Sequence, residues 1–403
     1  MSAKKDDMDL LRLACRQGLL SETELQYLRE EHTQSSRIGR AASPTRLAIE
    51  RGLLSENSAR DLETDAWVQN LPKQLDNYRL IRLLGRGGMA VVFEAQDVSL
   101  GKAVALKVLL PEFSSSESYL SRFHREARIA AKLTHPNTVQ VFAAGEAKGI
   151  EYLVMEYVDG ETLSTVIKNR RRIPEPEALD MIIGITEALE EAADMGIVHR
   201  DIKPGNIMIS KWGITKLADF GIAKEFGDIT DRQIQVSLTL GVVGTPHYMS
   251  PEQAKGARHL DFRSDIYSLG STLYHIVVGE LPFEGNTPQE TMVRVISEAP
   301  RPPRAVLSSL SEQTAAVIGK MMAKDPDDRY QSYEVLRADL VAARDGETVS
   351  IDYDEAAELM KPTEEREESA MEPLSLLRAL AVAGAVVIIG IVLLWLMKGG
   401  CAG

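Results

Sequence analysis

The sequence predicts an α+β chain in which a β-rich part is followed by a longer, mainly α-helical part, with a cleft between the two. Three observations lead to this prediction. Apolar and polar residues alternate from Tyr78 onward, as in half-buried strands. From Thr162 to about Arg344 the apolar residues instead recur at helical spacing. Two short polar loops, 199–206 and 219–221, then bring carboxylate, amide and lysine side chains into the helical part.

Length and composition limit the functions that need considering. The 403 residues leave room for two or three domains. A net charge of −13 argues against a general nucleic-acid binder, which would carry a basic face. The two cysteines, Cys15 and Cys401, stand far apart, so neither a disulfide framework nor a zinc site is expected. This cysteine usage is typical of a reducing compartment.

Residues 1–70 contain an internal repeat. The stretch Leu13–Glu22 recurs as Leu47–Glu56, 34 residues later. Each copy predicts a helix, a glycine stop and a second helix that begins at a serine. We interpret the region as a small all-α interaction module with an unknown protein partner. The signature aromatics of tetratricopeptide repeats are absent, so that name is not given. Residues 71–77 are interpreted as a linker.

The β-rich part begins with a predicted hairpin, Tyr78–Leu84 and Val91–Ala95, bent over the glycines of 85–88. A third strand is predicted over Ala103–Leu109 and a helix over Ser118–Leu133. Further strands at 139–144 and 152–157 would complete a small sheet.

The pattern Gly85-x-Gly87-x-x-Ala90 is a weak signal alone, because a dinucleotide-binding turn also begins G-x-G. Here the loop joins two strands, whereas the dinucleotide motif joins a strand to a helix. No G-x-x-x-x-G-K-[ST] sequence occurs, which excludes a P-loop NTPase. Glycines let the backbone approach phosphates closely. The alternative is an ordinary tight hairpin.

Lys107 lies in the apolar third strand, and Glu126 lies in the helix that follows. An isolated buried ammonium is costly, so Lys107 needs a carboxylate or phosphate partner. Further along, Asp201, Asn206 and Asp219 are spaced so that two loops joined by short strands could hold them around a metal–phosphate cluster. The combination favours phosphoryl transfer.

With these motifs in this order, residues 78–344 resemble the bacterial, eukaryotic-like serine/threonine protein kinases. The resemblance implies the bilobal protein kinase fold, with a β-rich N-lobe and an α-helical C-lobe. It implies transfer of the ATP γ-phosphate to serine or threonine hydroxyls of proteins, with autophosphorylation, in membrane-associated signalling. The cofactors would be ATP and Mg²⁺, and Mn²⁺ and a homodimer are both compatible with it. Departures from the family pattern are Ala90 for the third glycine and Ser250 for the alanine of the A-P-E motif.

The resemblance also assigns residue roles. Asp201 would accept the proton of the substrate hydroxyl, and Lys203 would steady the γ-phosphate. Lys107, paired with Glu126, would hold the α- and β-phosphates. Asn206 and Asp219 would bind the metal. The residues implied to bind the nucleotide are Gly85, Arg86, Gly87, Gly88, Val92, Ala105, Lys107, Glu156, Val158 and Met208.

The activation segment follows the same pattern. Residues 245–252 resemble the substrate-binding loop, with Glu252 expected to pair with Arg329. Asp265 would brace the catalytic loop. Arg200 before Asp201 implies control by phosphorylation, because an arginine can bind a loop phosphate. The regulatory candidates are Ser237, Thr239 and Thr245.

The last part of the chain changes character. Residues 345–375 are acidic and poor in aromatics, which favours a flexible juxtamembrane linker. Ala379–Met397 carries no charge over 19 residues. A helix of that length rises roughly 28 Å, enough to cross a bilayer. We therefore predict a transmembrane helix at 376–398 and a short tail at 399–403. A buried core helix is the alternative.

The predicted location is the cell membrane, single-pass, with the kinase domain in the cytoplasm. An inactive pseudokinase that serves as a membrane-anchored scaffold is the alternative function. Such proteins usually lack the lysine or a metal ligand, and here Lys107, Asn206 and Asp219 are all present.

Overall fold

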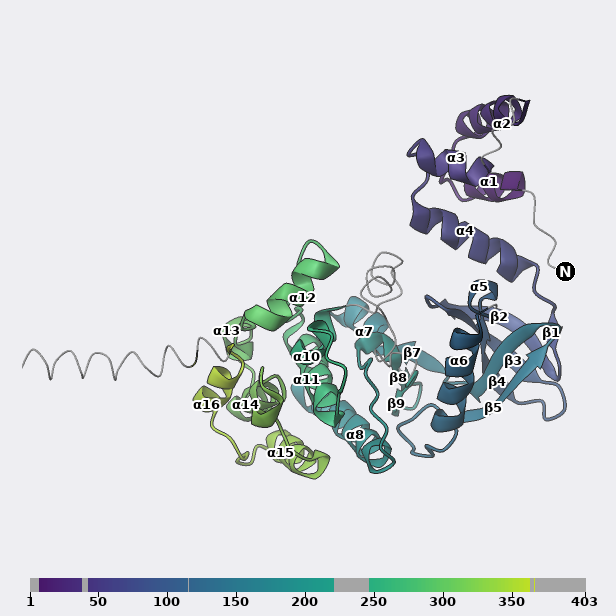
Figure 1. Ribbon diagram of the computed structural model, residues 1–403. Helices are drawn as coiled ribbons and strands as arrows, with labels where there is room; N and C mark the ends of the chain where they lie inside the picture. The colour runs from purple at the N-terminus through teal and green to yellow at the C-terminus, as the bar shows by residue number, and fades with distance from the viewer. Residues whose placement is uncertain (1–6, 38–42, 115, 221–245, 363–365, 367–403) are drawn as a thin grey trace, which may run out of the picture. The chain divides into compact units, whose positions relative to one another are not determined.

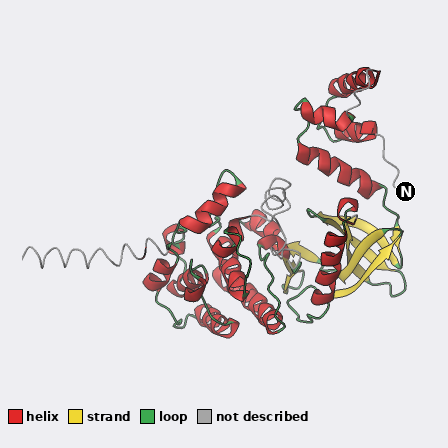
Figure 2. Ribbon diagram, viewed as in Figure 1, coloured by secondary structure: helices red, strands yellow, loops and turns green. Residues whose placement is uncertain are grey.

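The computed structural model describes residues 7–37, 43–114, 116–220 and 246–362, together with Arg366 (Figures 1 and 2). The chain divides into two compact units. The N-terminal unit holds the described residues up to Glu117 and the segment Ala144–Val154. The C-terminal unit holds Ser118–Ala143 and the described residues from Met155 onward.

The N-terminal unit begins with the helices α1 (Asp7–Arg16), α2 (Glu22–Arg37), α3 (Pro44–Glu50) and α4 (Glu56–Gln69). The predicted helix–glycine–serine pattern is confirmed in both copies of the repeat. Gly18 and Gly52 have φ of 72° and 68°, values that glycine adopts without strain. Ser21 and Ser55 then accept hydrogen bonds from backbone N–H groups three residues on. Leucines and alanines from both copies form one small shared core.

A sheet follows, with strands in the order β1-β2-β3-β4-β6-β5. The strands are β1 (Gln74–Leu75), β2 (Tyr78–Arg86), β3 (Ala90–Asp97), β4 (Ala103–Leu109), β5 (Val141–Ala147) and β6 (Ile150–Glu156). Alternate residues of β3 and β4, such as Phe93 and Leu106, point to one face and form the core of this sheet. Val92 and Lys107 are directly opposite in register and therefore share the other face. The short helix α5 (Pro111–Ser114) follows β4.

Helix α4 contributes to both cores of the N-terminal unit. Leu62 and Ala66 belong to the core of the four helices, whereas Trp67 and Val68 pack against the core of the sheet. The segment 71–77 was expected to be a linker, and this interpretation does not hold. Leu75 pairs with β2 and is fully buried in the sheet core, because its strand closes the edge of the sheet beside α4.

The C-terminal unit is mainly helical. Its elements are α6 (Glu117–Ala130), β7 (Gly160–Thr162), α7 (Leu163–Arg170), α8 (Glu175–Asp194), the 3₁₀ turn η1 (Pro204–Asn206), β8 (Ile207–Ser210), β9 (Thr215–Leu217), η4 (Pro246–Tyr248), α10 (Pro251–Ala254), α11 (Phe262–Val278), α12 (Pro288–Ser297), α13 (Pro303–Val306), α14 (Glu312–Met321), η5 (Pro326–Asp328), α15 (Tyr333–Asp345) and α16 (Tyr353–Leu359). Helix α11 is buried over most of its length and on all sides, so it forms the centre of the helical core. Strands β7, β8 and β9 form a second small sheet.

The expected flexible linker after Asp345 is wrong for its first half, because α16 is docked on the helical core. Ala356 and Met360 are buried there. A Cβ built on Gly319 of α14 would lie 2.7 Å from the Ala356 carbonyl oxygen, so only glycine permits this approach. Arg366 also pairs with Asp328, at 2.8 Å.

Among the residues that the structure describes, no helix is long and apolar enough to cross a bilayer. The predicted transmembrane helix at 376–398 and the tail at 399–403 lie outside the described residues.

Removing the buried side chain that anchors α16 should destabilise the C-terminal unit. We expect Met360→Ala to lower the free energy of unfolding by about 2–4 kcal/mol, because it leaves a cavity between α16 and the core. Urea unfolding measures the effect. The exposed Glu355 of the same helix supplies the control, Glu355→Ala, which should change stability by less than about 0.5 kcal/mol. Equal stability of the two variants would show that α16 does not depend on this contact.

Candidate active site

The catalytic loop, residues 199–206 between α8 and β8, is hydrogen-bonded through its backbone to one buried carboxylate. Asp265 of α11 accepts hydrogen bonds from the backbone N–H groups of His199, at 2.6 Å, and Arg200, at 2.8 Å. Burial raises the pKa of Asp265 to about 7, and the two N–H donors oppose this rise because they favour the ionised form. Arg200 has a φ of 65°, so the loop turns sharply just before Asp201.

The His199 ring links this loop to the segment that carries Asp219. Its Nδ1 accepts from the Asp201 N–H at 3.2 Å, so the neutral ring carries its proton on Nε2. Nε2 lies 3.2 Å from the Ala218 carbonyl oxygen, to which it donates. The ring also packs against Phe220, with centroids 4.7 Å apart. The fully buried His199 therefore fixes the spacing between the two polar loops.

Asp201 is surrounded by the polar groups that the sequence predicted. Its Oδ2 accepts from Lys203 Nζ at 2.9 Å and from Asn206 Nδ2 at 3.0 Å. Asn206 Nδ2 also donates to the Asp201 carbonyl oxygen, at 2.8 Å. The carboxylate is thus oriented by one cation and one amide, in a partly buried setting.

Asp219 is placed beside Asn206 by the backbone. The Ala218 N–H donates to the Asn206 carbonyl oxygen at 2.8 Å, and Asp219 follows with a φ of 57°. Among the described residues, no group of three or more His, Cys, Asp or Glu side chains could hold a metal by itself. Mg²⁺ commonly takes one or two protein oxygens and completes its shell with phosphates and water. The carboxylate and amide oxygens of Asp219 and Asn206 fit that use.

In the N-terminal unit, residues expected to bind the nucleotide share the face of the sheet opposite its core. Gly85 is in register with Val92, and Val92 with Lys107, and Ala105 lies one pleat further on the same face. A Cβ at Gly85 would meet no atom within 4 Å, so the space beside the loop is open to a ligand. Gly87 N–H donates to the Ala90 carbonyl oxygen at 2.8 Å and closes the loop. These groups suit a nucleotide.

The Arg86 side chain does not lie on the face of the sheet that carries Lys107. It is in register with Val91, whose side chain lies in the sheet core. The Arg86 guanidinium forms an ion pair with Asp65 of α4. Its side chain is therefore on the face away from Lys107, and only its backbone lies with the glycines of the loop.

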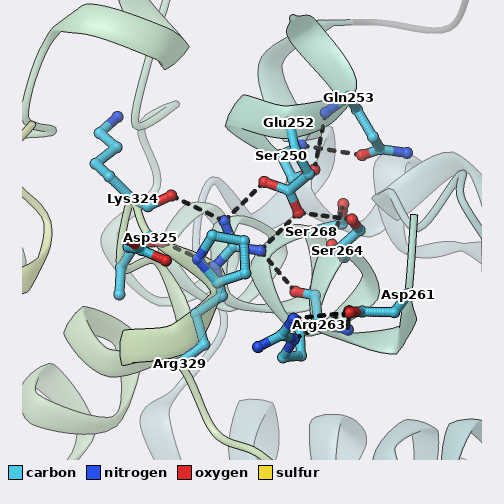
Figure 3. A network of polar contacts seen from close by, with 12 residues as sticks. Ser250, Glu252, Gln253, Asp261, Arg263, Ser264, Ser268, Lys324, Asp325 and Arg329 are labelled. Atoms are coloured by element: carbon cyan, nitrogen blue, oxygen red, sulfur yellow. Dashed lines mark hydrogen bonds and ion pairs between the residues drawn. The ribbon is translucent and has the colours of Figure 1, made fainter. Parts of the chain in front are cut away.

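The substrate-binding segment is anchored by the predicted pair of Glu252 and Arg329, which is confirmed (Figure 3). Arg329 is buried, and all five of its N–H groups have acceptors. Two donate to the Glu252 carboxylate, at 2.7 and 2.9 Å, and three to carbonyl oxygens of residues 263, 323 and 324. Burial alone would raise the pKa of Glu252, but Arg329 and the Ser264 hydroxyl outweigh it and lower this pKa to about 2.

Two contacts of the site were missed in the sequence. Gln253 Nε2 donates to the Arg200 carbonyl oxygen at 3.0 Å and so ties the substrate-binding segment to the catalytic loop. The Ser250-x-x-Gln253 capping box was readable in the sequence, but it indicates only the start of α10 and not the contact with Arg200. Glu156, which the resemblance implies to bind the nucleotide, also receives a hydrogen bond from Lys216 Nζ at 3.0 Å. No local pattern indicates that pairing.

The structure brings Asp201, Lys203, Asn206 and Asp219 together, and it places Gly85, Val92, Ala105 and Lys107 on one face of the sheet. Val158 and Met208 belong to the C-terminal unit, where Val158 is buried and Met208 lies in β8. The backbone of Glu126 lies in α6, but its side chain is outside the described residues. Ser237, Thr239 and Thr245 also lie outside them.

An oriented aspartate, an adjacent lysine and a metal-binding pair, on a fold with a glycine loop over a small sheet, define a phosphotransferase of the kinase type. The profile of the protein kinase domain matches residues 78–341, and the chain belongs to this family.

Curated relatives point the same way. The serine/threonine-protein kinase PknB of Mycobacterium tuberculosis is 43% identical over 276 residues, which are 68% of this chain and 44% of PknB. A probable serine/threonine-protein kinase of Streptomyces coelicolor is 42% identical over 283 residues, 69% of this chain and 42% of that protein. The chain thus spans less than half the length of these relatives.

Among solved structures, the PknI kinase domain of Mycobacterium tuberculosis is similar, with a TM-score of 0.53 and 27% identity. The match covers 67% of this chain and 97% of the PknI domain. It supports the bilobal kinase fold expected from the sequence.

The ion pair of Glu252 should make stability depend on acid in a defined window. The pKa of Glu252 is lowered from 4.5 to about 2, so its contribution is present above pH 4.5 and is lost as the pH falls toward 2. We expect Glu252→Gln to cost roughly 3 kcal/mol at pH 7, because Arg329 loses its buried counter-charge. Denaturant unfolding at several pH values measures the difference from the wild type.

The control is Glu358→Gln, which removes an exposed ion pair with Lys361 and should have little effect. A difference between Glu252→Gln and the wild type that stays constant from pH 6 to pH 2 would contradict the assignment.

Proposed function

We propose that this chain is a serine/threonine protein kinase that transfers the ATP γ-phosphoryl group to protein hydroxyls and phosphorylates itself. The observation that carries the proposal is the Asp201 carboxylate, oriented by Lys203 and Asn206 beside the Asp219 segment. The similarity to PknB over the kinase domain supports the serine/threonine class.

In the proposed reaction, the carboxylate of Asp201 receives the hydroxyl proton as the substrate oxygen attacks the γ-phosphorus. The bond from the γ-phosphorus to the β–γ bridging oxygen breaks, and ADP leaves with that oxygen. Lys203, 2.9 Å from the Asp201 carboxylate, places positive charge where the transferred phosphoryl group gains contact with the acceptor. Asn206 and Asp219 would hold Mg²⁺, which neutralises phosphate charge when it is bound. Lys107 and the backbone of the glycine loop would bind the phosphates. Most of the rate enhancement then comes from positioning and fixed charge.

Replacing the proposed base should remove phosphoryl transfer while the fold remains. We expect Asp201→Asn to lower kcat by about 10²–10⁴-fold, because the amide cannot accept the hydroxyl proton. Incorporation of phosphate into the protein itself and into a generic protein substrate, with Mg-ATP, measures it. Asp194→Asn, on an exposed carboxylate at the end of α8, is the control and should retain full activity.

Wild-type protein that binds Mg-ATP but transfers no phosphate would overturn the kinase proposal and favour a nucleotide-binding scaffold. Unchanged transfer by Asp201→Asn would overturn the role of Asp201.

We also propose that residues 376–398 anchor the protein in the cell membrane with the kinase domain on the cytoplasmic side. The supporting observation is the uncharged run Ala379–Met397.

Phosphorylation at Ser237, Thr239 or Thr245 would act on the catalytic loop through Arg200. The N-terminal helices would bind a protein partner. A homodimer is compatible with this partner binding and with the proposed phosphorylation.

Loss of the apolar segment should release the protein from membranes. We expect the full chain to stay in the carbonate-washed membrane fraction and a chain ending at residue 375 to become extractable, because about 19 apolar residues supply the insertion energy. Immunoblotting of the fractions measures it. Equal extraction of both chains would contradict the anchor.

A further inference from the structure

The glycine loop of this protein is connected to the N-terminal helices through a short chain of polar contacts. Arg86, the residue between Gly85 and Gly87, forms its ion pair with Asp65 Oδ1. The other oxygen of the same carboxylate, Oδ2, accepts a hydrogen bond from Gln17 Nε2 at 2.7 Å. Gln17 follows the end of α1, so three residues join α1, α4 and the loop.

The packing of α4 fixes the position of the Asp65 side chain. Its side chain is only 12% exposed, although it lies on a surface helix. The next residues of α4, Ala66 and Trp67, pack into the helical core and against the sheet core respectively. Helix α4 therefore cannot shift relative to either core without loss of buried contacts. The carboxylate is fixed with respect to the sheet from which the glycine loop projects.

The other partner of the ion pair, Arg86, is more exposed than Asp65. The Arg86 side chain is 40% exposed and ends β2, where the strand gives way to the loop. A charge contact at this residue restrains the backbone on both sides of it, including Gly85 and Gly87. The Arg86 side chain lies on the face of the sheet opposite Lys107. Its contact with Asp65 therefore does not occupy the face that we expect to bind the nucleotide.

We propose that Asp65 is a positioning residue that pre-orders the glycine loop for nucleotide, and that the N-terminal helices thereby set the ATP affinity of the kinase. The proposal rests on the proposed function, since it assigns a controlling contact to the same site. A loop held in place before binding loses less conformational entropy when the phosphates arrive. A partner that moved α1 or α4 would alter Asp65 and change ATP affinity without touching Asp201.

The test is a double-mutant cycle in the full chain with Asp65→Asn, Arg86→Gln and both together. The probe is Mg-ADP, whose dissociation constant is measured by titration, together with kcat and KM for ATP. We expect Asp65→Asn to raise the dissociation constant and KM roughly two- to fivefold, in line with a partly exposed ion pair, and kcat to change by less than about twofold. The double variant should be no weaker than Arg86→Gln alone, because the two residues act as one contact.

Asp61→Asn is the matched control, since it removes an exposed aspartate from the same helix one turn earlier. Thermal unfolding of each variant separates a lost contact from a damaged fold. Arg86→Gln breaks the pair without disturbing the contact of Asp65 with Gln17. Additive effects of the two substitutions, or an Asp65→Asn variant that binds Mg-ADP as Asp61→Asn does, would overturn the proposal.

Amide hydrogen exchange of residues 85–89 in the nucleotide-free protein keeps this test independent of catalysis. We expect faster exchange in Asp65→Asn and Arg86→Gln than in Asp61→Asn, because the restraint on the loop is gone. Equal exchange would overturn the proposal even in an active kinase. Conversely, a wild type that transfers no phosphate would remove the proposed function, while the exchange result would still decide whether Asp65 orders the loop.

Discussion

The acceptance of two backbone N–H bonds by the Asp265 carboxylate is the interaction on which the catalytic loop depends. Asp265 belongs to α11, which is buried over most of its length, so the catalytic loop is attached to a tightly packed helix. Two further hydrogen bonds connect this loop to other segments: the His199 ring donates to the Ala218 carbonyl oxygen, and the Arg200 carbonyl oxygen accepts from Gln253. Asp201 is thus oriented by a framework of main-chain contacts, and its own side-chain bonds complete the arrangement. A preorganised site of this kind needs little rearrangement when charge develops.

Much of the fold and of the site could be predicted because the signals are local. The strand Ala103–Leu109 was predicted with the bounds that it has, since its apolar run is short and clearly delimited. The pairing of Glu252 with Arg329 and the bracing role of Asp265 followed from the family resemblance and are confirmed. Asp201, Lys203 and Asn206 are also close in the sequence, and the stretch ends in the tight turn η1, so a short motif can encode their arrangement.

The features that could not be predicted depend on contacts between distant segments. Leu75 looked like part of a linker because a two-residue strand has no periodicity to detect. The acidic composition after Asp345 concealed α16, although Ala356 and Met360 stand at helical spacing and are its buried anchors. The role of Arg86 was missed for the same reason. A residue within a glycine motif suggests a phosphate contact, and nothing nearby in the sequence indicates Asp65 on another helix.

The docking of α16 limits how far the kinase domain could lie from the membrane anchor that we propose at residues 376–398. The last described residue, Arg366, is paired with Asp328, so 9 residues, 367–375, separate this contact from the proposed anchor. Even fully extended, a chain of that length reaches only about 30 Å. A chain free from residue 345 onward would have reached roughly 105 Å. If the proposed anchor at 376–398 spans a membrane, this shorter connection would keep the kinase domain near the bilayer surface, where substrates on the same membrane would reach it at a high local concentration.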